Sequence, residues 1–490
     1  MYLGLDLGTS GLKALLVDEQ QRAIDSQTCP LEVSRPHPGW SEQQPADWIA
    51  AAESALDALK DRHPAELVAV RGIGLSGQMH GATLLDVAGE VLRPCILWSD
   101  TRSHVQAARL DADPRFRQIS GNIVFPGFTA PKLAWVAEHE PELFERVAKV
   151  LLPKDFLRLW LTGEYCSEMS DAAGTSWLDT GKRCWSCELL TASGMSLEQM
   201  PGLVEGTDPS GNLRKTLAER WGMSDTVVVA GGAGDNAASA VGTGTVTAGS
   251  AFVSLGTSGV LFAANDRYLP NPRSAVHAFC HALPAIWHQM GVILSASGAL
   301  DWFARLSGSR PTELTAALGD RVQPPAALTF LPYLSGERTP HNDAAVRGVF
   351  AGLAHESDRN ALIRALLEGV AFALRDNLEA LRAASTELSE LTAVGGGSRS
   401  RYWLGVIANA LGLPVQVPAE GDFGAAFGAA RLALIATTGA APLAVCTPPR
   451  IAETIEPDPR LKGAFEQAYG RYRALYPAVS AVMGETGERR

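Results

Sequence analysis

One short turn occurs twice in this chain, and the two copies lie about half its length apart. The first copy, Asp6–Gly11, reads DLGTSG, and the second, Ser254–Gly259, reads SLGTSG. Each copy follows apolar residues typical of a β-strand and leads into another apolar run. A repeated strand, turn and strand predicts two similar domains that face each other across a central cleft.

The composition of the turn suits phosphate binding. Its glycines allow backbone N–H groups to converge, and the hydroxyls of Thr9 and Ser10 add hydrogen-bond donors. The first position differs between the copies, because the carboxylate of Asp6 corresponds to the neutral hydroxyl of Ser254. A carboxylate repels phosphate unless a divalent cation lies between them. This asymmetry predicts ATP held between two half-sites, with Mg²⁺ bound at Asp6.

The length of the chain also favours two domains. A chain of 490 residues exceeds what one hydrophobic core normally holds and fits two domains of roughly 200 to 250 residues. Strand-like and helix-like segments occur together in both halves, which indicates an α/β fold. A stretch rich in Gly, Thr and Ala near residues 242–249 predicts a hinge, with domains at 1–245 and 246–490.

Charge and cysteine content argue against several kinds of partner. The net charge of −11 disfavours nucleic acid or an anionic membrane surface as the main partner. The longest weakly polar stretch, residues 227–264, is interrupted by Asp235, Asn236 and many glycines, so no membrane span is expected. No secretory signal is visible, and the seven cysteines lack disulfide-framework spacing, which favours a cytoplasmic location.

Asp235 is the strongest candidate for a catalytic residue. It follows a predicted strand, residues 226–231, and the glycine-rich segment Gly231–Gly234, and it precedes a predicted helix. A carboxylate there would project into the cleft from a helix N-terminus. In phosphoryl transfer to an alcohol, such a group accepts the hydroxyl proton while the phosphates are held in line. The alternative is that Asp235 is only the N-cap of the helix.

Two further segments indicate ligand contacts. Gly395-Gly396-Gly397 lies between a predicted strand and a helix, where the absence of side chains suits a nucleotide. A tight turn is the simpler alternative for this triplet. Gln78-Met79-His80-Gly81 ends a predicted strand, and its polar groups suit sugar hydroxyls while Met79 suits the carbon face. A structural histidine is the alternative for His80.

Two other constellations do not indicate a metal site, and one charged loop has two possible roles. Cys184 and Cys187 form a lone pair without the second pair or spaced histidines of a zinc site. His277 and His281 have ligand spacing only on a helix, and their flanks indicate strand and loop, so ordinary packing is expected. The charged loop Ser335–His341 is consistent with a clamp between domains and equally with a surface salt bridge.

Four motifs in order along the chain carry a resemblance to a known family. They are Asp6-x-Gly8-Thr9-Ser10, Gly234-Asp235-Asn236, Gly256-Thr257-Ser258 and Gly395-Gly396-Gly397. With the segments 127–135 and 348–353, they resemble the carbohydrate kinases of the FGGY type. The resemblance covers nearly the whole chain and departs from the family pattern at Ala361 and Leu366. It implies two ribonuclease H-like domains of the actin-like ATPase superfamily around a central cleft.

The resemblance also implies roles for individual residues. The segment around Met79 and His80 is most similar to family members that phosphorylate D-xylulose, and it lacks the Arg-Glu pair of glycerol kinases. Asp235 is then the base that accepts the O5 proton. The implied sugar contacts are Met79, His80, Asp235 and Asn236. The implied magnesium and phosphate contacts are Asp6, Thr9, Ser10 and Lys13, and the implied nucleotide contacts are Gly256, Thr257, Gly298, Gly395, Gly396 and Gly397.

Two rival functions remain open. A sister kinase of the same family would act on ribulose, gluconate, glycerol or another polyol through the same Asp235 mechanism. An ATP-driven binding protein of the actin-like superfamily, such as a chaperone or filament subunit, would hydrolyse ATP without any sugar. That class needs a peptide-binding domain or polymer contacts, and the sequence shows no appended segment for either. A homodimer is a further expectation for which no motif argues directly.

Overall fold

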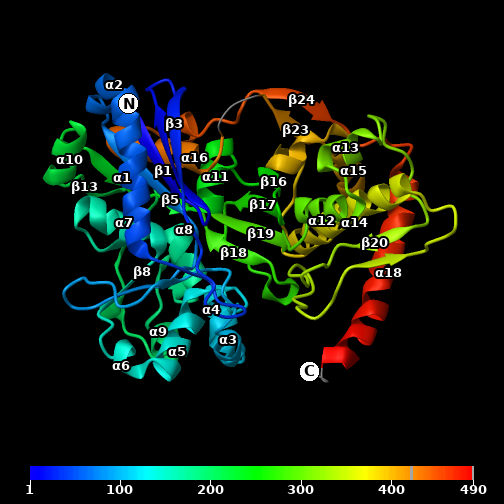
Figure 1. Ribbon diagram of the computed structural model, residues 1–490, viewed down its shortest axis with the longest axis horizontal. Coiled ribbons are helices and arrows are strands. Elements are labelled where there is room, and N and C mark those ends of the chain that lie inside the picture. Colours follow the sequence, from blue (N-terminus) through cyan, green and yellow to red (C-terminus); the bar gives the residue numbers. More distant parts are fainter. Residues whose placement is uncertain (420–422, 488–490) are drawn as a thin grey trace.

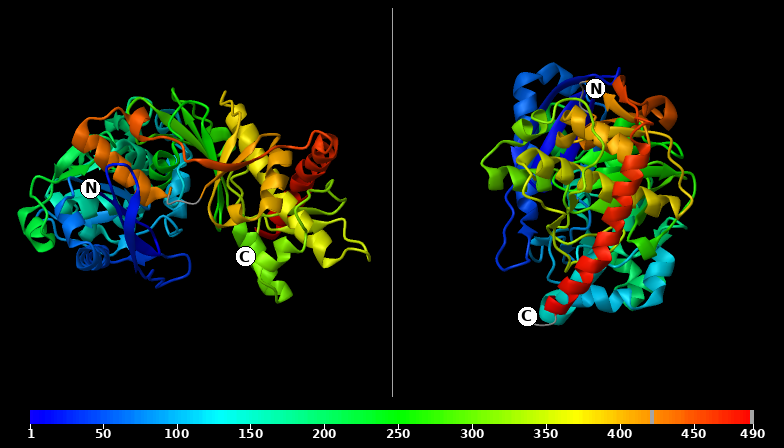
Figure 2. Two further views of the ribbon diagram at one scale, coloured as in Figure 1. Left: turned by 90° about the horizontal axis from the view of Figure 1, so that it is seen from above. Right: turned by 90° about the vertical axis from the view of Figure 1, so that its right-hand side faces the viewer.

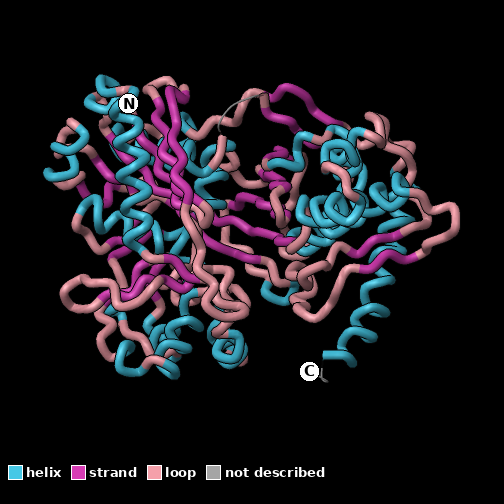
Figure 3. Tube along the Cα trace, viewed as in Figure 1, coloured by secondary structure: helices cyan, strands magenta, loops and turns pink. Residues whose placement is uncertain are grey.

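Two mixed β-sheets, one from each half of the chain, lie at the centre of the structure (Figures 1 and 3). This computed structural model describes residues 1–419 and 423–487. The first sheet has the strand order β13-β14-β5-β1-β2-β3, and β15 also pairs with β5. Its strands are β1 (Tyr2–Leu7), β2 (Gly11–Val17), β3 (Ala23–Pro30), β5 (Gly72–Gly77), β13 (Pro209–Asn212), β14 (Val228–Ala230) and β15 (Ala233–Gly234).

The second sheet is formed by residues of the second half and has the order β18-β19-β17-β16-β22-β23-β24. Its strands are β16 (Ala251–Leu255), β17 (Gly259–Asn265), β18 (His277–Cys280), β19 (Trp287–Ile293), β22 (Leu391–Val394), β23 (Val415–Pro418) and β24 (Ile451–Ile455). Each glycine turn therefore joins the first two strands of its sheet.

The two sheets share one topology. In the first, β1 pairs antiparallel with β2, β2 antiparallel with β3, and β1 parallel with β5. In the second, β16 pairs antiparallel with β17, β17 antiparallel with β19, and β16 parallel with β22. A further parallel strand follows in each, β14 beside β5 and β23 beside β22. This correspondence confirms the predicted duplication and the two-domain α/β fold.

Amphipathic helices cover the sheets. Helix α1 (Pro45–Arg62) packs on β2 and β3, and it buries Trp48, Leu56 and Leu59 completely. Helix α14 (Arg359–Arg382) packs on β17 and β19 of the second sheet and against α15 (Arg401–Leu411). Helix α18 (Lys462–Gly487) carries the chain away from the second sheet toward the C-terminus (Figure 1). Over the described residues, no helix combines the length and apolar character needed to cross a lipid bilayer.

Helix α16 (Ala425–Thr438) comes from the second half of the chain but packs on the first sheet. It crosses β1 and β5 and runs against α11 (Asp235–Thr243). Figure 2 shows this orange helix in the lobe that contains the N-terminus. A Cβ on Gly74 would lie 1.8 Å from the carbonyl oxygen of Ala429, so the close contact requires glycine. The chain therefore passes between the sheets after α11, before α16 and again before β24.

The first parallel strand begins later than the apolar run 68–75 predicts. Pro64 begins a short helix, α2 (Pro64–Val68), and β5 starts only at Gly72. Proline is favourable at the first position of a helix because its missing N–H needs no partner there. The strand ends at Gly77, and the predicted sugar segment follows directly.

Candidate active site between the two sheets

The first glycine turn holds Asp6 at the end of β1. The N–H of Gly8 donates to the carbonyl oxygen of Gly11 over 3.0 Å, which closes the turn. Strand pairing places Asp6 opposite Lys13 of β2 and beside Ser76 of β5. The Ser76 hydroxyl donates to Oδ1 of Asp6 over 2.9 Å. The half-buried Asp6 carboxylate is therefore held by a hydrogen bond from β5, while the backbone of Asp6 pairs with β2.

The hydroxyl of Thr9 is engaged within the protein. It donates to Oε1 of Gln78 and accepts from Nε1 of Trp98, each over 2.9 Å. Gln43 also donates to the Thr9 carbonyl oxygen over 2.8 Å. These bonds fix the shape of the turn, whereas Ser10 is exposed. Trp98 is 46% exposed beside the turn, and sequence reasoning missed it because no local pattern marks it.

Asp235 is the first residue of α11, and Gly234 takes the N-cap position, so the N-cap alternative for Asp235 is wrong. Its Oδ1 accepts from the backbone N–H of Asn236 over 2.7 Å and from the side-chain Nδ2 of Asn236 over 2.8 Å. Burial, and after it the negative charge of Asp6, raise the pKa of Asp235 to about 6. A carboxylate with this pKa is able to accept a proton near neutral pH.

Met79 and His80 follow β5 and lie close to the start of α11. A Cβ on Gly234 would lie 2.9 Å from Cγ of Met79, so the thioether side chain packs against the N-cap residue. The His80 ring stacks on Phe128 with ring centroids 4.5 Å apart. Nδ1 of His80 lies 2.7 Å from the carbonyl oxygen of Gly174. Burial lowers the pKa of His80 to about 3, so its imidazole is neutral at physiological pH.

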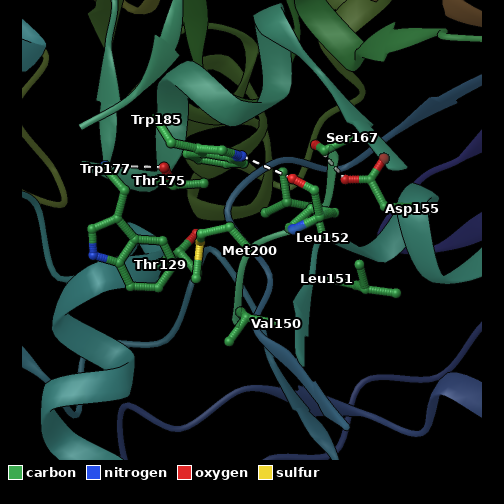
Figure 4. A pocket seen from close by; sticks show the side chains of 11 residues that line it. Thr129, Val150, Leu151, Leu152, Asp155, Ser167, Thr175, Trp177, Trp185 and Met200 are labelled. Atoms are coloured by element: carbon green, nitrogen blue, oxygen red, sulfur yellow. Dashed lines mark hydrogen bonds between the residues drawn. The ribbon is translucent and has the colours of Figure 1, made fainter. Parts of the chain in front are cut away.

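A fully buried group of charged side chains lies in the first half, next to these residues. Nζ of Lys154, in α7 (Pro153–Thr162), lies 2.7 Å from Asp155, 3.1 Å from Asp171 and 3.2 Å from Glu168. The Ser167 hydroxyl donates to Asp155 over 2.6 Å, at the wall of an interior cavity of about 10 Å³ (Figure 4). That cavity has room for about one water molecule and not for a sugar.

The charged group reaches the candidate site through Ser170. The Ser170 hydroxyl donates to Oε2 of Glu168 over 2.8 Å and accepts from the N–H of Gly234 over 3.1 Å. Arg158 donates to the carbonyl oxygen of Ala230 over 2.7 Å and also to that of Gly231. The backbone that leads into α11 is therefore held by Ser170 and Arg158, and sequence reasoning missed these contacts.

The second glycine turn lies beside the start of α12 (Ser297–Ser307). The carbonyl oxygen of Thr257 accepts from the N–H of Gly298 over 3.1 Å, and that of Gly256 accepts from the N–H of Ser297 over 2.8 Å. A Cβ on Gly298 would lie 2.9 Å from the Thr257 carbonyl oxygen. The structure therefore brings Gly256, Thr257 and Gly298 together, as their predicted common role requires.

The glycine triplet borders the same turn. Gly395 has a φ of +88°, and a Cβ on it would lie 3.0 Å from the backbone of Leu255. A Cβ on Gly397 would lie 2.8 Å from Oγ of Ser297. A Cβ on Gly396 would meet no described atom within 4 Å, so this residue faces open space. Gly395 precedes a short 3-10 helix, Gly396–Arg399, and the position of the triplet keeps side chains away from the second glycine turn.

A cavity of about 650 Å³ lies beside the triplet and between the two halves. Its walls include Gly395 and Arg399 from the second half and Ser239 and Thr243 from α11. Ser239 and Thr243 follow Asp235 by four and eight residues, so all three occur at the spacing of one helical face. That spacing was a usable signal in the sequence, although the two hydroxyl residues were not predicted. The volume suits a ligand of nucleotide size.

The loop Ser335–His341 makes contact between the halves. Within the second half, Nη1 of Arg338 lies 3.2 Å from Nε2 of His277. The Arg338 guanidinium also lies 4.9 Å from the ring centroid of Phe125, which belongs to the first half. This cation–π contact favours the clamp over the surface salt bridge, because Arg338 forms no ion pair with a described carboxylate.

The residues present fit a metal that arrives with a nucleotide. Within residues 1–419 and 423–487, no group of three or more His, Cys, Asp or Glu side chains is arranged to hold a metal ion. Mg²⁺ is usually bound through one or two carboxylates together with water and substrate phosphates. Asp6, with Asp235 as its electrostatic neighbour, supplies carboxylate chemistry of this kind.

Comparison with known families agrees with this arrangement. The N-terminal domain of the FGGY family of carbohydrate kinases matches residues 1–242, and the C-terminal domain of the same family matches residues 251–437. The chain therefore belongs to the FGGY family of carbohydrate kinases.

Proteins of high sequence identity to this chain include xylulose kinases of two bacteria. The chain is 49% identical over 486 residues to the xylulose kinase of Escherichia coli K12, a match that covers 99% of this chain and 100% of that protein. It is 51% identical to the xylulose kinase of Klebsiella pneumoniae over 89% of this chain and 90% of that one. A crystal structure of a xyloylose kinase from Brucella ovis has 65% identity and a TM-score of 0.97, and covers 98% of this chain and 99% of that chain.

Proposed function

We propose that this protein transfers the γ-phosphoryl group of ATP to O5 of D-xylulose, with Asp235 as the general base. The observation that carries the proposal is the position of Asp235 at the start of α11, where burial and Asp6 raise its pKa to about 6. D-xylulose is chosen because relatives of high identity over nearly the full chain are xylulose kinases.

The proposed reaction follows from the two halves of the site. Asp235 accepts the proton of the O5 hydroxyl as O5 forms a bond to the γ-phosphorus. The bond between the γ-phosphorus and the bridging oxygen breaks, and ADP leaves. Met79, His80 and Asn236 line the sugar in this proposal, and Asn236 also holds the Asp235 carboxylate through two hydrogen bonds.

The second half supplies the nucleotide side of the proposal. The cavity of about 650 Å³ beside Gly395 is the proposed nucleotide site, next to Gly256, Thr257, Gly298 and the rest of the triplet. Asp6 would hold Mg²⁺, with Ser10, Lys13 and the Thr9 turn near the phosphates. Bound Mg²⁺ neutralises charge that develops on the phosphates. Closure of the two halves would exclude water, which otherwise competes with O5.

The test is a coupled measurement of ADP release with ATP and Mg²⁺. D-xylulose, D-ribulose, L-ribulose, glycerol and gluconate are offered separately, and the phosphorylated position is identified by NMR. Release stimulated selectively by D-xylulose, with the 5-phosphate as product, supports the proposal. A preference for another polyol would replace the substrate and keep the mechanism. A rate that no sugar changes would overturn the kinase proposal and favour an ATP-driven binding protein.

A further inference from the structure

His80 has a backbone conformation that side chains rarely adopt. Its φ is +70°, in the left-handed region, where the Cβ of a non-glycine residue is crowded. Such a conformation persists only where the surrounding structure holds it, and it is often found at functional sites.

Two side chains of α5 (Thr129–His139) bind the carbonyl group of His80. Nζ of Lys132 donates to the carbonyl oxygen over 2.7 Å, and Oγ1 of Thr129 donates to it over 3.2 Å. Both residues are fully buried. Lys132 forms no ion pair with a described carboxylate, and a buried amine without an anion is costly compared with an apolar side chain. Packing alone therefore does not explain a lysine at this position.

The imidazole of His80 is held just as specifically. Nδ1 lies 2.7 Å from the carbonyl oxygen of Gly174, and because a carbonyl oxygen only accepts, Nδ1 carries the proton. Nε2 then has a free lone pair, and no described residue hydrogen-bonds to it. A Cβ on Gly174 would lie 2.5 Å from Nδ1, so the ring fits only against glycine. Burial lowers the pKa of His80 to about 3, which agrees with a neutral ring.

We infer that Lys132 and Thr129 are positioning residues of the sugar site, which hold His80 so that Nε2 accepts a hydrogen bond from a sugar hydroxyl. This inference rests on the proposed function and adds to it the groups that act on the sugar through His80. The hydrogen bonds of Lys132 and Thr129 to the His80 carbonyl oxygen fix the backbone and thus the direction of the His80 side chain. The carbonyl oxygen of Gly174 sets the tautomer and the orientation of the imidazole ring.

The test begins with three small changes at this contact. Lys132→Met removes one donor to the carbonyl at nearly constant volume, and Thr129→Val removes the other. Gly174→Ala adds only a methyl group against Nδ1. Each is expected to raise KM for the sugar about 10- to 100-fold and to leave KM for ATP unchanged, because misplacement of a contact by about 1 Å has effects of this size.

A control and a double-mutant cycle separate positioning from general structure. Lys149→Met removes a lysine contact to backbone carbonyl oxygens at a more exposed position, Glu198 at 2.6 Å and Met200 at 3.3 Å, and is expected to leave KM for the sugar unchanged. In a His80→Gly background, Lys132→Met is expected to change KM for the sugar by less than about twofold, since its effect acts through the missing imidazole.

An NMR measurement without sugar or ATP tests the same inference independently of activity. Imidazole ¹⁵N shifts are expected to report His80 as the neutral Nδ1–H tautomer from about pH 5 to about pH 8, the range in which an ordinary histidine changes its charge. A protonated ring or an Nε2–H tautomer would overturn the inference. So would additive effects in the double mutant, or an unchanged KM for the sugar in both Thr129→Val and Lys132→Met. If Lys132→Met does not fold, Thr129→Val decides. Absence of sugar phosphorylation by the wild type would instead contradict the proposed function.

Discussion

Arg431 and Val241 are joined by a hydrogen bond of 2.9 Å from the guanidinium Nη1 to the carbonyl oxygen. Arg431 lies in α16, and Val241 lies in the last turn of α11, the helix that begins with Asp235. The same nitrogen also donates to Gly242 over 3.1 Å, so a cation meets the negative end of the helix dipole. A segment from the second half therefore stabilises the helix that carries the proposed base in the first half.

Replacement of the proposed base is the most direct test of the mechanism. Asp235→Asn keeps the shape of the side chain but removes the proton acceptor. We expect kcat to fall about 100-fold or more, because loss of a general base has effects of this size, while KM for ATP stays unchanged. Steady-state kinetics of ADP release check this. Retention of more than about a tenth of the wild-type kcat would remove Asp235 as the base.

The pH dependence of the sugar kcat/KM is expected to follow Asp235. The base works only when ionised, so activity falls as the pH drops through about 6, the raised pKa of this carboxyl. Asp6→Asn removes the negative charge that contributes to the raised pKa. The residual activity of this variant should therefore decline at a lower pH than that of the wild type.

Ser76→Ala is the matched control for this experiment. It removes the 2.9 Å hydrogen bond to Asp6 and keeps the Asp6 charge, so its acid limb should stay at the wild-type pH. Equal limbs in Asp6→Asn and the wild type would contradict the electrostatic link between the two carboxylates.

The contact between α16 and the first sheet should tolerate no side chain at Gly74. In Gly74→Ala, the new Cβ would lie 1.8 Å from the Ala429 carbonyl oxygen, so the helix must move. We expect a loss of more than about 2 kcal/mol in the free energy of unfolding. Gly470→Ala in α18 is the control, because its Cβ meets no described atom within 4 Å. This change should be neutral or stabilising by up to about 1 kcal/mol. Similar urea midpoints for the two variants would argue against the steric explanation.

The buried charged group should depend on Lys154. Lys154→Met leaves Asp155, Glu168 and Asp171 without their shared cation, and all four side chains are fully buried. We expect the free energy of unfolding to fall by about 3 to 5 kcal/mol. Lys182→Met, which breaks an exposed contact of 2.8 Å to Asp179, should change stability little. A mild effect of Lys154→Met on chemical denaturation would mean that the carboxyls are protonated together.

Stability at alkaline pH should improve when Glu368 is neutralised. Burial raises the pKa of Glu368 to about 8, with partial compensation from Arg364. Between its ordinary pKa of 4.5 and about 8, the unfolded state loses this proton and the native state keeps it, so stability falls as pH rises. Glu368→Gln removes the effect, and its advantage should grow by up to about 1.4 kcal/mol per pH unit. Urea unfolding of both proteins at about pH 5, 6.5 and 8, which cover most of this window, checks the prediction. A difference in the free energy of unfolding between Glu368→Gln and the wild type that stayed constant with pH would contradict it.

Much of the fold could be predicted from the sequence because its signals are local. The repeated turn predicted the strands that pair on either side of it in both sheets. The glycines at 231–234 predicted a break between a strand and the helix that starts at Asp235. The N-cap is Gly234, however, and the capping preference of aspartate could not reveal that.

The rest of the site depends on contacts between residues far apart in the chain. Thr129 and Lys132 bind a carbonyl about 50 residues before them, and no pattern in either segment records this distance. Trp98 reaches Thr9 across 89 positions. The position of α16 was equally hidden, because its alanine-rich sequence suits burial against any sheet. Residue types indicated the chemistry that is proposed for the site, whereas the positions of these side chains depend on tertiary packing.

The placement of α16 has a mechanical consequence. A single crossing would tether two lobes at one point, whereas this chain links them at three points. The same arrangement means that a backbone cut after α11 would not release the two pieces, because the C-terminal piece would still hold a helix seated on the other sheet. The chain therefore joins the two lobes at three points, and α16 adds a packed contact with β1 and β5 of the first sheet.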